Sequence, residues 1–545
     1  MATADIYDIK WHRAILELHY TCDSENRFCI LLTDGKKRIP FEMRMQTHGN
    51  VGTAYLNLMT ACGREPLPAG KWVITAEPDL ELRYAPGLLE NPDAYTMFFR
   101  YAKAKYACAV WFTVQQTDEH VLAVALHADF YIRNPRPRVR KNSLRYLEKK
   151  IFRMAYRLTC LVIRRRGNQI LFFKQNAEKP ADNMTALIRR IRERGLDETY
   201  SLKFRYRNVF SGGQSVWEWL KDLTVIAGSD YIFIDDYAPI FDFIDLDDDV
   251  VLTQLWHAGV GFKSVGYARF GLSGSPDPFS SAHRHYTWAL VGNEYLRDIY
   301  AEVFGIEREA LLATGLPRLD HFLDDSVMEA AKNRLYGRYP QLRESRVILF
   351  APTYRGVGQK DAYYPYEYLD VSTLYDLCEE TDSCFIYEMH HFIKERPRIP
   401  AEYAERILDL TDENLNELFY IADVLITDYS SCFYDYLLLN RPVILYMPDR
   451  TLYTAMHGVQ RSIEEMAPGE ICGTFEALTD TLRTKHYRDV RPKSVTIDRA
   501  AEHGMMASDR VIDTILLGED VPGVKMEMQG DLPEAAGQQC DPRLI

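Results

Sequence analysis

The sequence predicts an α/β protein made of two Rossmann-type parallel-sheet domains, preceded by a small β-rich accessory domain. Short apolar runs separated by helical stretches begin near Asn168, and this alternation is typical of the βαβ units that build parallel sheets. About 350 residues of this pattern exceed one doubly wound sheet of usual size, so two such domains facing each other are expected. The first 132 residues instead contain short, partly alternating apolar runs between turn signals, which favours β structure.

The composition is that of a soluble globular protein and sets limits on function. The chain has 545 residues, of which 47% are hydrophobic and 26% charged, and its net charge of −13 argues against general nucleic-acid coating. Its 10 cysteines include no CxxC pair, so neither a zinc site nor a dense disulfide framework is expected. The first residues do not resemble a signal peptide, and no apolar run approaches the ~20 residues that span a bilayer. We therefore expect a cytoplasmic protein, soluble or peripheral to a membrane.

Residues 1–132 are expected to form the accessory domain, a small β-sandwich or a related β module. Turn signals such as Asp34-Gly35 and Pro86-Gly87 separate its apolar runs. No catalytic constellation occurs here, which favours a packing or binding role. The expected strands lie at 15–20, 72–75, 109–114 and 121–126.

Residues 133–167 are expected to form a basic amphipathic helical linker. Thirteen residues from Arg133 to Arg166 are Arg or Lys, and Glu148 is the one acidic residue among them. From about Asn142, apolar residues recur at helical spacing. Such a helix in an acidic protein is attracted to an anionic surface, most simply the inner leaflet of a membrane. The alternative is a linker that packs on its own protein. No motif supports binding to RNA or DNA.

The remaining chain divides into two predicted domains and a tail. Residues 168–325 form the first parallel-sheet domain, residues 326–519 the second, and the Gly- and Pro-containing residues 520–545 a disordered tail. Sheets of this type bind ligands at the carboxyl ends of their strands, so a cleft between two sheets would collect motifs from both. The expected strands lie at 169–173, 224–227, 231–234, 250–256, 287–291, 347–350, 383–387, 424–427 and 442–446.

The first motif that carries chemistry runs from the strand at 250–256 into His257 and a glycine-containing loop with Lys263. Histidine is the side chain best suited to accept a proton near neutral pH. Gly259 and Gly261 let the backbone approach a ligand closely. His257 is therefore a candidate general base, and the alternative is a histidine that forms a structural hydrogen bond at the strand end.

Two further strands end in polar residues. The strand at 347–350 leads to Arg355, whose planar guanidinium suits a phosphate, although an ordinary surface ion pair is the alternative. The strand at 383–387 leads to His390 and His391, and either could hydrogen-bond a phosphate or transfer a proton. Neighbouring histidines point in different directions, so metal binding is not expected.

The strand at 424–427 ends in a polar turn that contains Asp428, Ser430 and Ser431, and a helix-like run follows at 433–439. The first N–H groups of a helix lack partners and its dipole favours negative charge, so a phosphate is expected at the two serines. Together these motifs predict a phosphate-handling transferase. No P-loop or GxGxxG fingerprint occurs, which disfavours ATP-driven or NAD chemistry, and neither a cofactor nor a metal is expected.

Taken together, these motifs resemble those of the CDP-glycerol glycerophosphotransferase family, the teichoic-acid primases and polymerases. The resemblance covers roughly residues 168–515, and its motifs occur in order along that length. The matching stretches are Trp256-His257, Phe262-Lys263 with Gly266, Thr314-Gly-Leu-Pro-Arg-Leu-Asp320, Ala351-Pro-Thr-Tyr-Arg355, Ile426-Thr-Asp-Tyr-Ser-Ser431, Arg441-Pro-Val-Ile-Leu-Tyr446 and Ala467-Pro-Gly469.

The resemblance implies a GT-B fold and transfer of glycerol phosphate or ribitol phosphate from its CDP donor to an acceptor hydroxyl, with release of CMP. The acceptor would be a lipid-linked glycan or a growing polyol-phosphate chain at the inner face of the cell membrane. Two alternatives stay open, a GT-B glycosyltransferase that uses a UDP-sugar and a non-catalytic membrane scaffold. By the resemblance, His257 deprotonates the acceptor and Lys263 binds substrate. The donor pyrophosphate is held by Arg355, one of His390 or His391, Asp428, Ser430 and Ser431.

Overall fold

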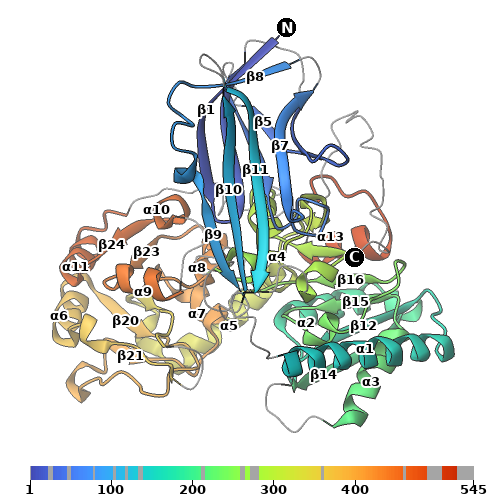
Figure 1. Cartoon of the computed structure of the whole chain (residues 1–545). Coiled ribbons are helices and arrows are strands. Elements are labelled where there is room, and N and C mark those ends of the chain that lie inside the picture. The colour runs from blue at the N-terminus through green and yellow to red at the C-terminus, as the bar shows by residue number, and fades with distance from the viewer. Residues whose placement is uncertain are drawn as a thin grey trace.

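The chain folds into an N-terminal β domain and two α/β domains. The β domain stands above the junction of the two α/β domains, which lie side by side (Figure 1). The predicted fold class is confirmed, including the pair of parallel sheets expected of a GT-B arrangement. The computed structural model describes residues 2–22, 29–45, 51–77, 80–101, 106–116, 121–132, 139–209, 215–257, 264–269, 276, 281–356, 361–457, 462–487 and 506–524.

The β domain is a sandwich of two mainly antiparallel sheets that share one hydrophobic core. The first sheet has the strand order β5 (Glu42–Met45), β6 (Val51–Asn57), β2 (Ile15–Cys22), β1 (Ala2–His12) and β8 (Leu80–Tyr84). The second has the order β4 (Arg38–Pro40), β3 (Cys29–Thr33), β7 (Gly70–Glu77), β11 (Val121–Ile132), β10 (Tyr106–Gln116) and β9 (Met97–Tyr101). In β2, Leu16, Leu18 and Tyr20 are buried while their neighbours are partly exposed, the alternation of a strand with one face in a core.

The first α/β domain is built on a seven-stranded sheet whose described pairs are parallel, apart from β13 with β14. Its order is β13 (Asn176–Ala177), β14 (Ser201–Asn208), β12 (Gln169–Lys174), β15 (Tyr231–Ile234), β16 (Val251–Gln254), β17 (Trp288–Leu290) and β18 (Leu311–Leu312). Helix α2 (Asp182–Glu193) and the segment 506–524 cover one face. The other face is covered by α1 (Val139–Val162), α3 (Val216–Ala227) and α4 (Leu296–Phe304).

The second α/β domain is built on a six-stranded parallel sheet. Its order is β21 (Ile407–Asp409), β20 (Ser383–Tyr387), β19 (Arg346–Phe350), β22 (Val424–Thr427), β23 (Val443–Tyr446) and β24 (Glu470–Cys472). One face packs on α6 (Val371–Thr381) and α11 (Phe475–Thr484), the other on α7 (Leu415–Ile421) and α8 (Cys432–Tyr436). Burial on both faces explains why these strands are continuous apolar runs. The described part of this domain also contains α5 (Asp325–Arg338), α9 (Arg450–His457) and α10 (Ile463–Met466).

One hydrophobic core runs from the first parallel sheet into the second. The 3₁₀ segment η8 (Pro317–Leu323) carries Phe322 onto Tyr420 of α7, with ring centroids 5.4 Å apart. At Gly292, after β17, an added Cβ would lie 2.1 Å from the hydroxyl of Tyr434 in α8. The backbone of one domain therefore lies directly against a side chain of the other, and any larger residue at this position would have to displace the Tyr434 ring.

The β domain is joined to the first α/β domain by arginines. Arg64 pairs with Glu307 through Nε at 2.8 Å, and its Nη1 donates to the main-chain oxygen of Arg284 at 2.8 Å. Arg284 is itself buried and donates to the main-chain oxygen of Met59 at 2.5 Å. Guanidinium groups that satisfy buried carbonyls across the boundary hold the two domains in one orientation.

Several elements differ from the sequence prediction, and three of them show why. The run at 224–227, expected as a strand, is the last turn of α3, because a four-residue apolar run fits either element and the N-cap at Ser215 favours the helix. Strand β14 is not predicted, since basic residues interrupt its apolar pattern. The helix expected at 433–439 is the five-residue α8 followed by a 3₁₀ turn, Leu437–Leu439.

The C-terminal segment returns to the first α/β domain. Helix α13 (Ala507–Val511) and the π-helical turn Ile512–Leu516 pack on α2 through Val511 and Ile512. The predicted boundary at 519 falls inside this segment, because Val521 and Val524 continue the same apolar packing. Residues 525–545 of the predicted tail lie outside the described residues.

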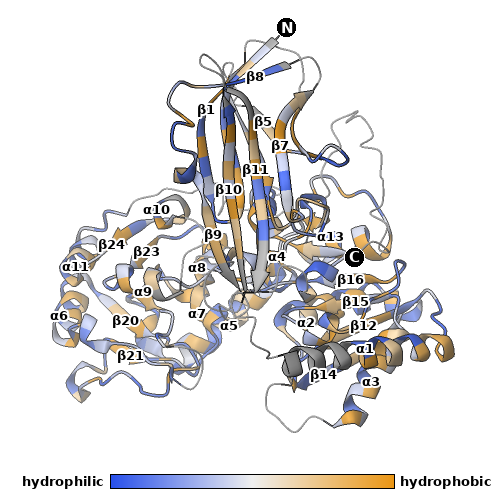
Figure 2. Cartoon of the chain, in the orientation of Figure 1, coloured by the Kyte–Doolittle hydropathy of each residue, from blue (hydrophilic) through white to orange (hydrophobic). Residues whose placement is uncertain are grey.

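Helix α1 confirms the expected helix but presents its apolar stripe to solvent. Its inner face buries Tyr156 and packs Phe152 on Trp219 of α3, with centroids 5.3 Å apart. Figure 2 shows apolar residues along its C-terminal half and along α3. Residues 133–138 of the linker lie outside the described residues. Among the described helices, none is long and apolar enough to cross a membrane. The outward stripe, 51–83% exposed, comprises Ile151, Met154, Leu158, Leu161 and Val162.

Candidate active site

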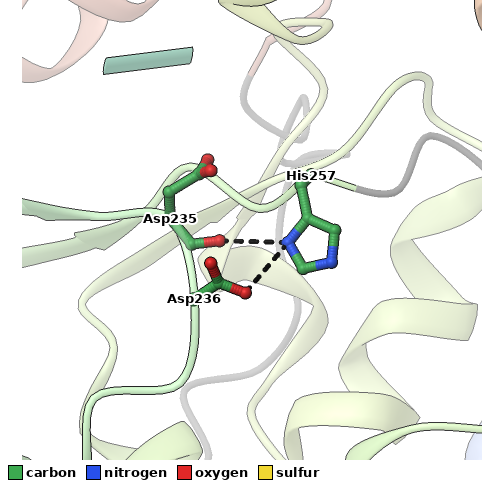
Figure 3. A group of neighbouring side chains, drawn as sticks. All are labelled: Asp235, Asp236 and His257. Carbon is green, nitrogen blue, oxygen red and sulfur yellow. Dashed lines mark hydrogen bonds and ion pairs between the residues drawn. The ribbon is translucent and has the colours of Figure 1, made fainter. Parts of the chain in front are cut away.

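His257 projects from the carboxyl end of β16 towards the residues that follow β15 (Figure 3). Its Nδ1 lies 3.2 Å from the main-chain oxygen of Asp235 and 3.4 Å from a carboxylate oxygen of Asp236. The two strands are parallel neighbours, so their carboxyl ends bring these residues together. Because both neighbours of Nδ1 are acceptors, Nδ1 carries a proton, and Nε2 of the neutral ring keeps a lone pair that can accept one.

The backbone at Trp256 turns His257 out of the sheet. Trp256 has a φ of 54°, a left-handed conformation that costs a bulky residue about 1–3 kcal/mol. Its buried indole packs on Phe304 with centroids 5.1 Å apart. The buried amide of Asn183 donates to the main-chain oxygen of Trp256 and, at 2.8 Å, to the carboxylate of Asp235. This support holds the strained turn and leaves the His257 side chain 50% exposed.

The two carboxylates beside His257 have different surroundings. Asp235 is buried, and burial raises its pKa to about 6 while the nearby His257 opposes the shift. Its carboxylate points away from the imidazole (Figure 3). Asp236 accepts a hydrogen bond from Asn176 at 2.8 Å and lies 3.4 Å from the ammonium of Lys174. The ligand atoms of the Asp235, Asp236 and His257 side chains lie within 4.8 Å of one another, which could hold a cation, but Asp236 already has Lys174 as a cationic partner.

On the second sheet, Arg355 is buried among carboxylates. Its Nε and Nη2 donate to Asp449 at 2.6 and 3.0 Å, and its Nη1 donates to Asp428 at 2.8 Å and to the main-chain oxygen of Thr353 at 2.6 Å. Burial opposes the charge, yet the two carboxylates raise the pKa of Arg355. This is a buried network, and Arg355 would have to leave these partners to hold a phosphate directly.

Asp428 joins the same network from the end of β22. One of its oxygens accepts from the main-chain N–H groups of Thr353 and Tyr429, at 2.7 and 2.6 Å, while the other pairs with Arg355. Its carboxylate therefore ties the loop after β19 to the turn after β22. Sequence reasoning misses Asp449, although its place three residues beyond β23 is the same signal that identifies Asp428.

Ser430 and Ser431 lie at the partly exposed edge of this network. The Ser430 hydroxyl accepts a hydrogen bond from the main-chain N–H of Cys432 at 3.3 Å. Ser431 is the N-cap of α8, and within the described part of the chain its hydroxyl makes no capping bond. Since α8 has five residues, its dipole is weaker than that of the predicted helix, so the hydroxyls themselves are the main polar groups that the turn offers to a ligand.

The two adjacent histidines differ in their placement. His390 is partly buried, and its ring lies 4.8 Å from that of Tyr354, the neighbour of Arg355. Its Nδ1 accepts a hydrogen bond from the main-chain N–H of Phe392 at 3.2 Å, so the neutral ring carries its proton on Nε2. His391 is exposed. His390 is therefore the one packed on the loop that carries Arg355.

Arg318 connects the His257 turn to the second domain. Its guanidinium pairs with Asp435 of α8 at 2.8 Å and donates to the main-chain oxygen of His257 at 3.2 Å. The main-chain N–H of Arg318 donates to the side-chain oxygen of Asn183 at 3.0 Å. One arginine of the Thr314–Asp320 stretch therefore fixes the position of His257 relative to the helix that follows Ser431.

Lys263 and the rest of the loop 258–263 lie outside the described residues. The chain that follows is anchored by the β domain, since Arg13 donates to the Ser264 hydroxyl at 2.8 Å and Tyr267 is buried in the β-domain core. Gly266 has a φ of 52°, and an added Cβ would lie 2.0 Å from the main-chain oxygen of Val303. The glycine of the matching sequence motif is thus required by a close backbone contact.

Comparisons with known proteins agree with the sequence resemblance. Residues 154–517 match the family model described as CDP-Glycerol:Poly(glycerophosphate) glycerophosphotransferase. The chain is 34% identical over 378 residues to the teichoic acid poly(ribitol-phosphate) polymerase of Bacillus spizizenii, covering 69% of this chain and 60% of that protein. It is 26% identical over 387 residues to the teichoic acid ribitol-phosphate primase of the same organism, covering 69% of this chain and 97% of that protein.

A Staphylococcus aureus relative and a solved structure complete the comparison. The teichoic acid ribitol-phosphate polymerase TarL of Staphylococcus aureus is 30% identical over 338 residues, covering 62% of this chain and 60% of that protein. The chain thus spans about 60% of the length of these polymerases. The structure of the wall teichoic acid polymerase TagF aligns with 18% identity and a TM-score of 0.47, covering 68% of this chain and 92% of that one.

Proposed function

Because the chain belongs to the CDP-glycerol:poly(glycerophosphate) glycerophosphotransferase family, we propose that it transfers a polyol phosphate from a CDP-polyol to an acceptor hydroxyl in the synthesis of a teichoic-acid-like polymer. The polyol is glycerol or ribitol, and the acceptor is a lipid-linked glycan or a growing polyol-phosphate chain. The observation that carries this proposal is the half-exposed His257, whose Nδ1 faces two oxygens and whose Nε2 is available as a base.

In the proposed reaction, Nε2 of His257 takes the proton of the acceptor hydroxyl as its oxygen bonds to the phosphorus that bears the polyol. The bond from that phosphorus to the bridging oxygen breaks, and CMP leaves. The imidazolium that forms is stabilised through Nδ1 by Asp236 and by the main-chain oxygen of Asp235. Asp236 thus orients the base and balances its charge during the transfer.

The donor pyrophosphate is proposed to bind at the second sheet. Ser430, Ser431 and His390 supply hydrogen-bond donors at the partly exposed ends of β20 and β22. Arg355 and Asp428 are proposed to act indirectly. Their ion pair holds in place the loops that carry these donors. Lys263 is proposed to bind substrate on the acceptor side.

A donor screen tests the proposal. The chain is incubated with a lipid-linked acceptor and CDP-glycerol, CDP-ribitol or a series of UDP-sugars, and nucleotide release is measured. CMP release with a CDP-polyol and none with UDP-sugars is expected. Turnover of a UDP-sugar alone would identify a glycosyltransferase, and absence of turnover with every donor would leave the scaffold alternative.

We further propose that α1 and α3 dock on the anionic inner leaflet of the cell membrane. The outward apolar stripe of α1 lies beside α3, whose Val216 and Trp217 are each 74% exposed. Arg157, Arg164 and Arg166 are exposed on the same segment of α1 and the residues that follow it. An apolar stripe flanked by arginines suits the interface of an anionic bilayer.

Flotation with anionic vesicles tests the membrane proposal. Binding is expected at low salt and should weaken at high salt, because the arginines contribute electrostatically. Substituting Leu161→Glu with Trp217→Glu should abolish flotation, while Val327→Glu, a control on α5 where the side chain is also exposed, should not. Equal flotation of all three proteins would contradict the assigned surface.

A further inference from the structure

A groove lies between α2 and strand β14, apart from the residues assigned to the reaction. It has a volume of about 460 Å³, within the range of ligand sites. Its apolar lining includes Ile188 and Phe204, and Phe204 leaves 44% of its surface exposed. Arg189 and Arg192 line it from the helix side. The groove therefore combines aromatic and aliphatic surface with two cations.

The arginines of α2 and its C-cap are used in two different ways. Arg190 pairs with Asp509 at 2.8 Å and Arg194 with Asp513 at 2.7 Å, which fastens the C-terminal segment to the helix. Arg189 is 3.6 Å from Glu193, a carboxylate on the same rim that also pairs with Arg190 at 3.1 Å. Among the described residues, the guanidinium of Arg192 has no ion-pair or hydrogen-bond partner, although its main-chain oxygen accepts from Gly195. The positive charge of Arg192 in the groove is therefore not neutralised by an ion pair among the described residues.

Tyr206 adds an unmet polar group to the lining of the groove. Its hydroxyl is buried and has no hydrogen-bond partner among the described residues. Burial raises the pKa of Tyr206 to about 12, and the positive charge of Arg192, which lines the same groove, opposes this shift. A buried hydroxyl without a partner is destabilising, and an anionic oxygen bound beside Arg192 would accept a hydrogen bond from the Tyr206 hydroxyl.

The groove leads away from the catalytic histidine. The first turn of α2 contains Asn183, which bonds to the turn that presents His257, and the groove is lined by Pro180 and Thr185 on either side of that residue. Arg192 lies nine residues further along the helix, about 14 Å at 1.5 Å per residue. Asn183 is buried whereas Thr185, Arg189 and Arg192 are exposed, so an acceptor chain whose end reaches His257 would pass around the first turn of α2 to enter the groove.

Resting on the proposed function, we propose that this groove binds phosphodiester units of the polyol-phosphate acceptor chain, behind the hydroxyl that reacts. Arg189 and Arg192 pair with the phosphates, and Phe204 and Ile188 contact the carbon atoms of the polyol. A lipid headgroup is the other source of a phosphodiester. The polymer is favoured because α2 covers the face of the sheet opposite to α1 and α3, which carry the exposed apolar stripe.

Binding measurements on the full chain test the groove without relying on turnover. The probe is a short fluorescently labelled poly(glycerol phosphate) oligomer, and its affinity is read from anisotropy. Arg189→Ala with Arg192→Ala is expected to weaken binding by about tenfold or more, which corresponds to about 1.4 kcal/mol, because charge-assisted hydrogen bonds to the phosphates are lost. Arg398→Ala, at a 94% exposed arginine of the second domain, should retain the wild-type affinity.

The outcomes separate this proposal from the proposed function. An unchanged affinity of the double variant for the oligomer would contradict the proposed binding of the acceptor chain in the groove. A double variant that loses binding to phosphatidylglycerol vesicles but still binds the oligomer would contradict it too, and would point to a lipid headgroup. CMP release from a CDP-polyol by the wild-type chain is measured alongside. If that release fails, the proposed function is wrong; if it succeeds while the double variant binds normally, the groove assignment alone is wrong.

Discussion

The two parallel sheets present their charged side chains in different ways. At the first, His257 is 50% exposed and held by contacts of 3.2 and 3.4 Å through Nδ1, so Nε2 can meet a substrate. At the second, Arg355, Asp428 and Asp449 are buried, and both carboxylates accept hydrogen bonds from Arg355 at 2.6–3.0 Å. The buried charges of the Arg355 network bind one another's loops and hold them in place. The half-exposed imidazole of His257 is accessible to a substrate and can take part in a reaction. The degree of burial therefore distinguishes side chains that position loops from side chains that can react, and residue type alone does not make this distinction.

The largest effect is expected at the exposed side. His257→Ala should lower CMP release by about 10²–10⁴-fold, the usual contribution of a positioned base. The free energy of unfolding should change little, since the side chain is half exposed. Initial rates and thermal unfolding of the same preparation check both statements. A rate within a few-fold of the wild type would show that another group takes the proton.

In the buried network around Arg355, a substitution should lower the free energy of unfolding, whereas the substitution at His257 should lower the reaction rate. Arg355→Ala leaves Asp428 and Asp449 buried without their cation, and removing one partner of a buried ion pair costs about 3–5 kcal/mol. Denaturant unfolding should show an earlier transition, and Arg398→Ala serves as the control at an exposed arginine. Arg355→Lys should not restore stability, because an ammonium cannot reproduce the two-sided fork. A transition that coincides with the wild type would mean that the network is not stabilising.

A smaller effect is expected from the residue that orients the base. Asp236→Asn keeps a polar group beside Nδ1 of His257 but removes the negative charge that stabilises the imidazolium. CMP release should fall by about 10–100-fold, a part of the contribution of the base itself. The pH–rate profile should also change shape, a readout that a merely structural substitution would not move. Identical profiles for the two proteins would remove Asp236 from the mechanism.

The smallest effect concerns stability and pH at the end of β20. Burial raises the pKa of Glu388 to about 8, with Arg396 opposing and Asp409 adding to the shift. A raised pKa means that the folded state holds the proton more tightly, so stability is lost as pH rises from the ordinary value towards 8. Glu388→Gln stays neutral and should flatten that decline in unfolding midpoints measured between about pH 5 and about pH 9. Parallel curves for the two proteins would contradict the shift.

Much of the fold is predictable because buried parallel strands are continuous apolar runs. The predicted strands at 383–387 and 424–427 coincide with β20 and β22. The same criterion gives a wrong result for the run at 224–227. A short apolar run at the end of an amphipathic helix cannot be distinguished by sequence from a short buried strand. Strand β14 is missed because Lys203, Arg205 and Arg207 break its pattern, and two of them, Arg205 and Arg207, pair with Asp222 of α3.

The site is predictable only in part, because its partners are set by strand order. His257 is identified from its place after a strand, but Asp236 becomes its neighbour because β15 lies beside β16. Arg355 is identified as a cation, whereas its burial depends on Asp449, 94 residues away in the turn after β23. Arg318 likewise pairs with Asp435 across the domain boundary. Periodicity and local motifs carry no information on such pairs.

The division of labour between the two sheets is tested by measuring donor affinity in two variants of one preparation. His257→Ala should bind a CDP-polyol as the wild type does, because the donor is proposed to lie on the second sheet. Ser430→Ala with Ser431→Ala should weaken donor binding by about tenfold, the loss expected for hydrogen bonds to a charged group. Equal loss of affinity in both variants, or loss in His257→Ala alone, would contradict the assignment of base and donor site to separate sheets.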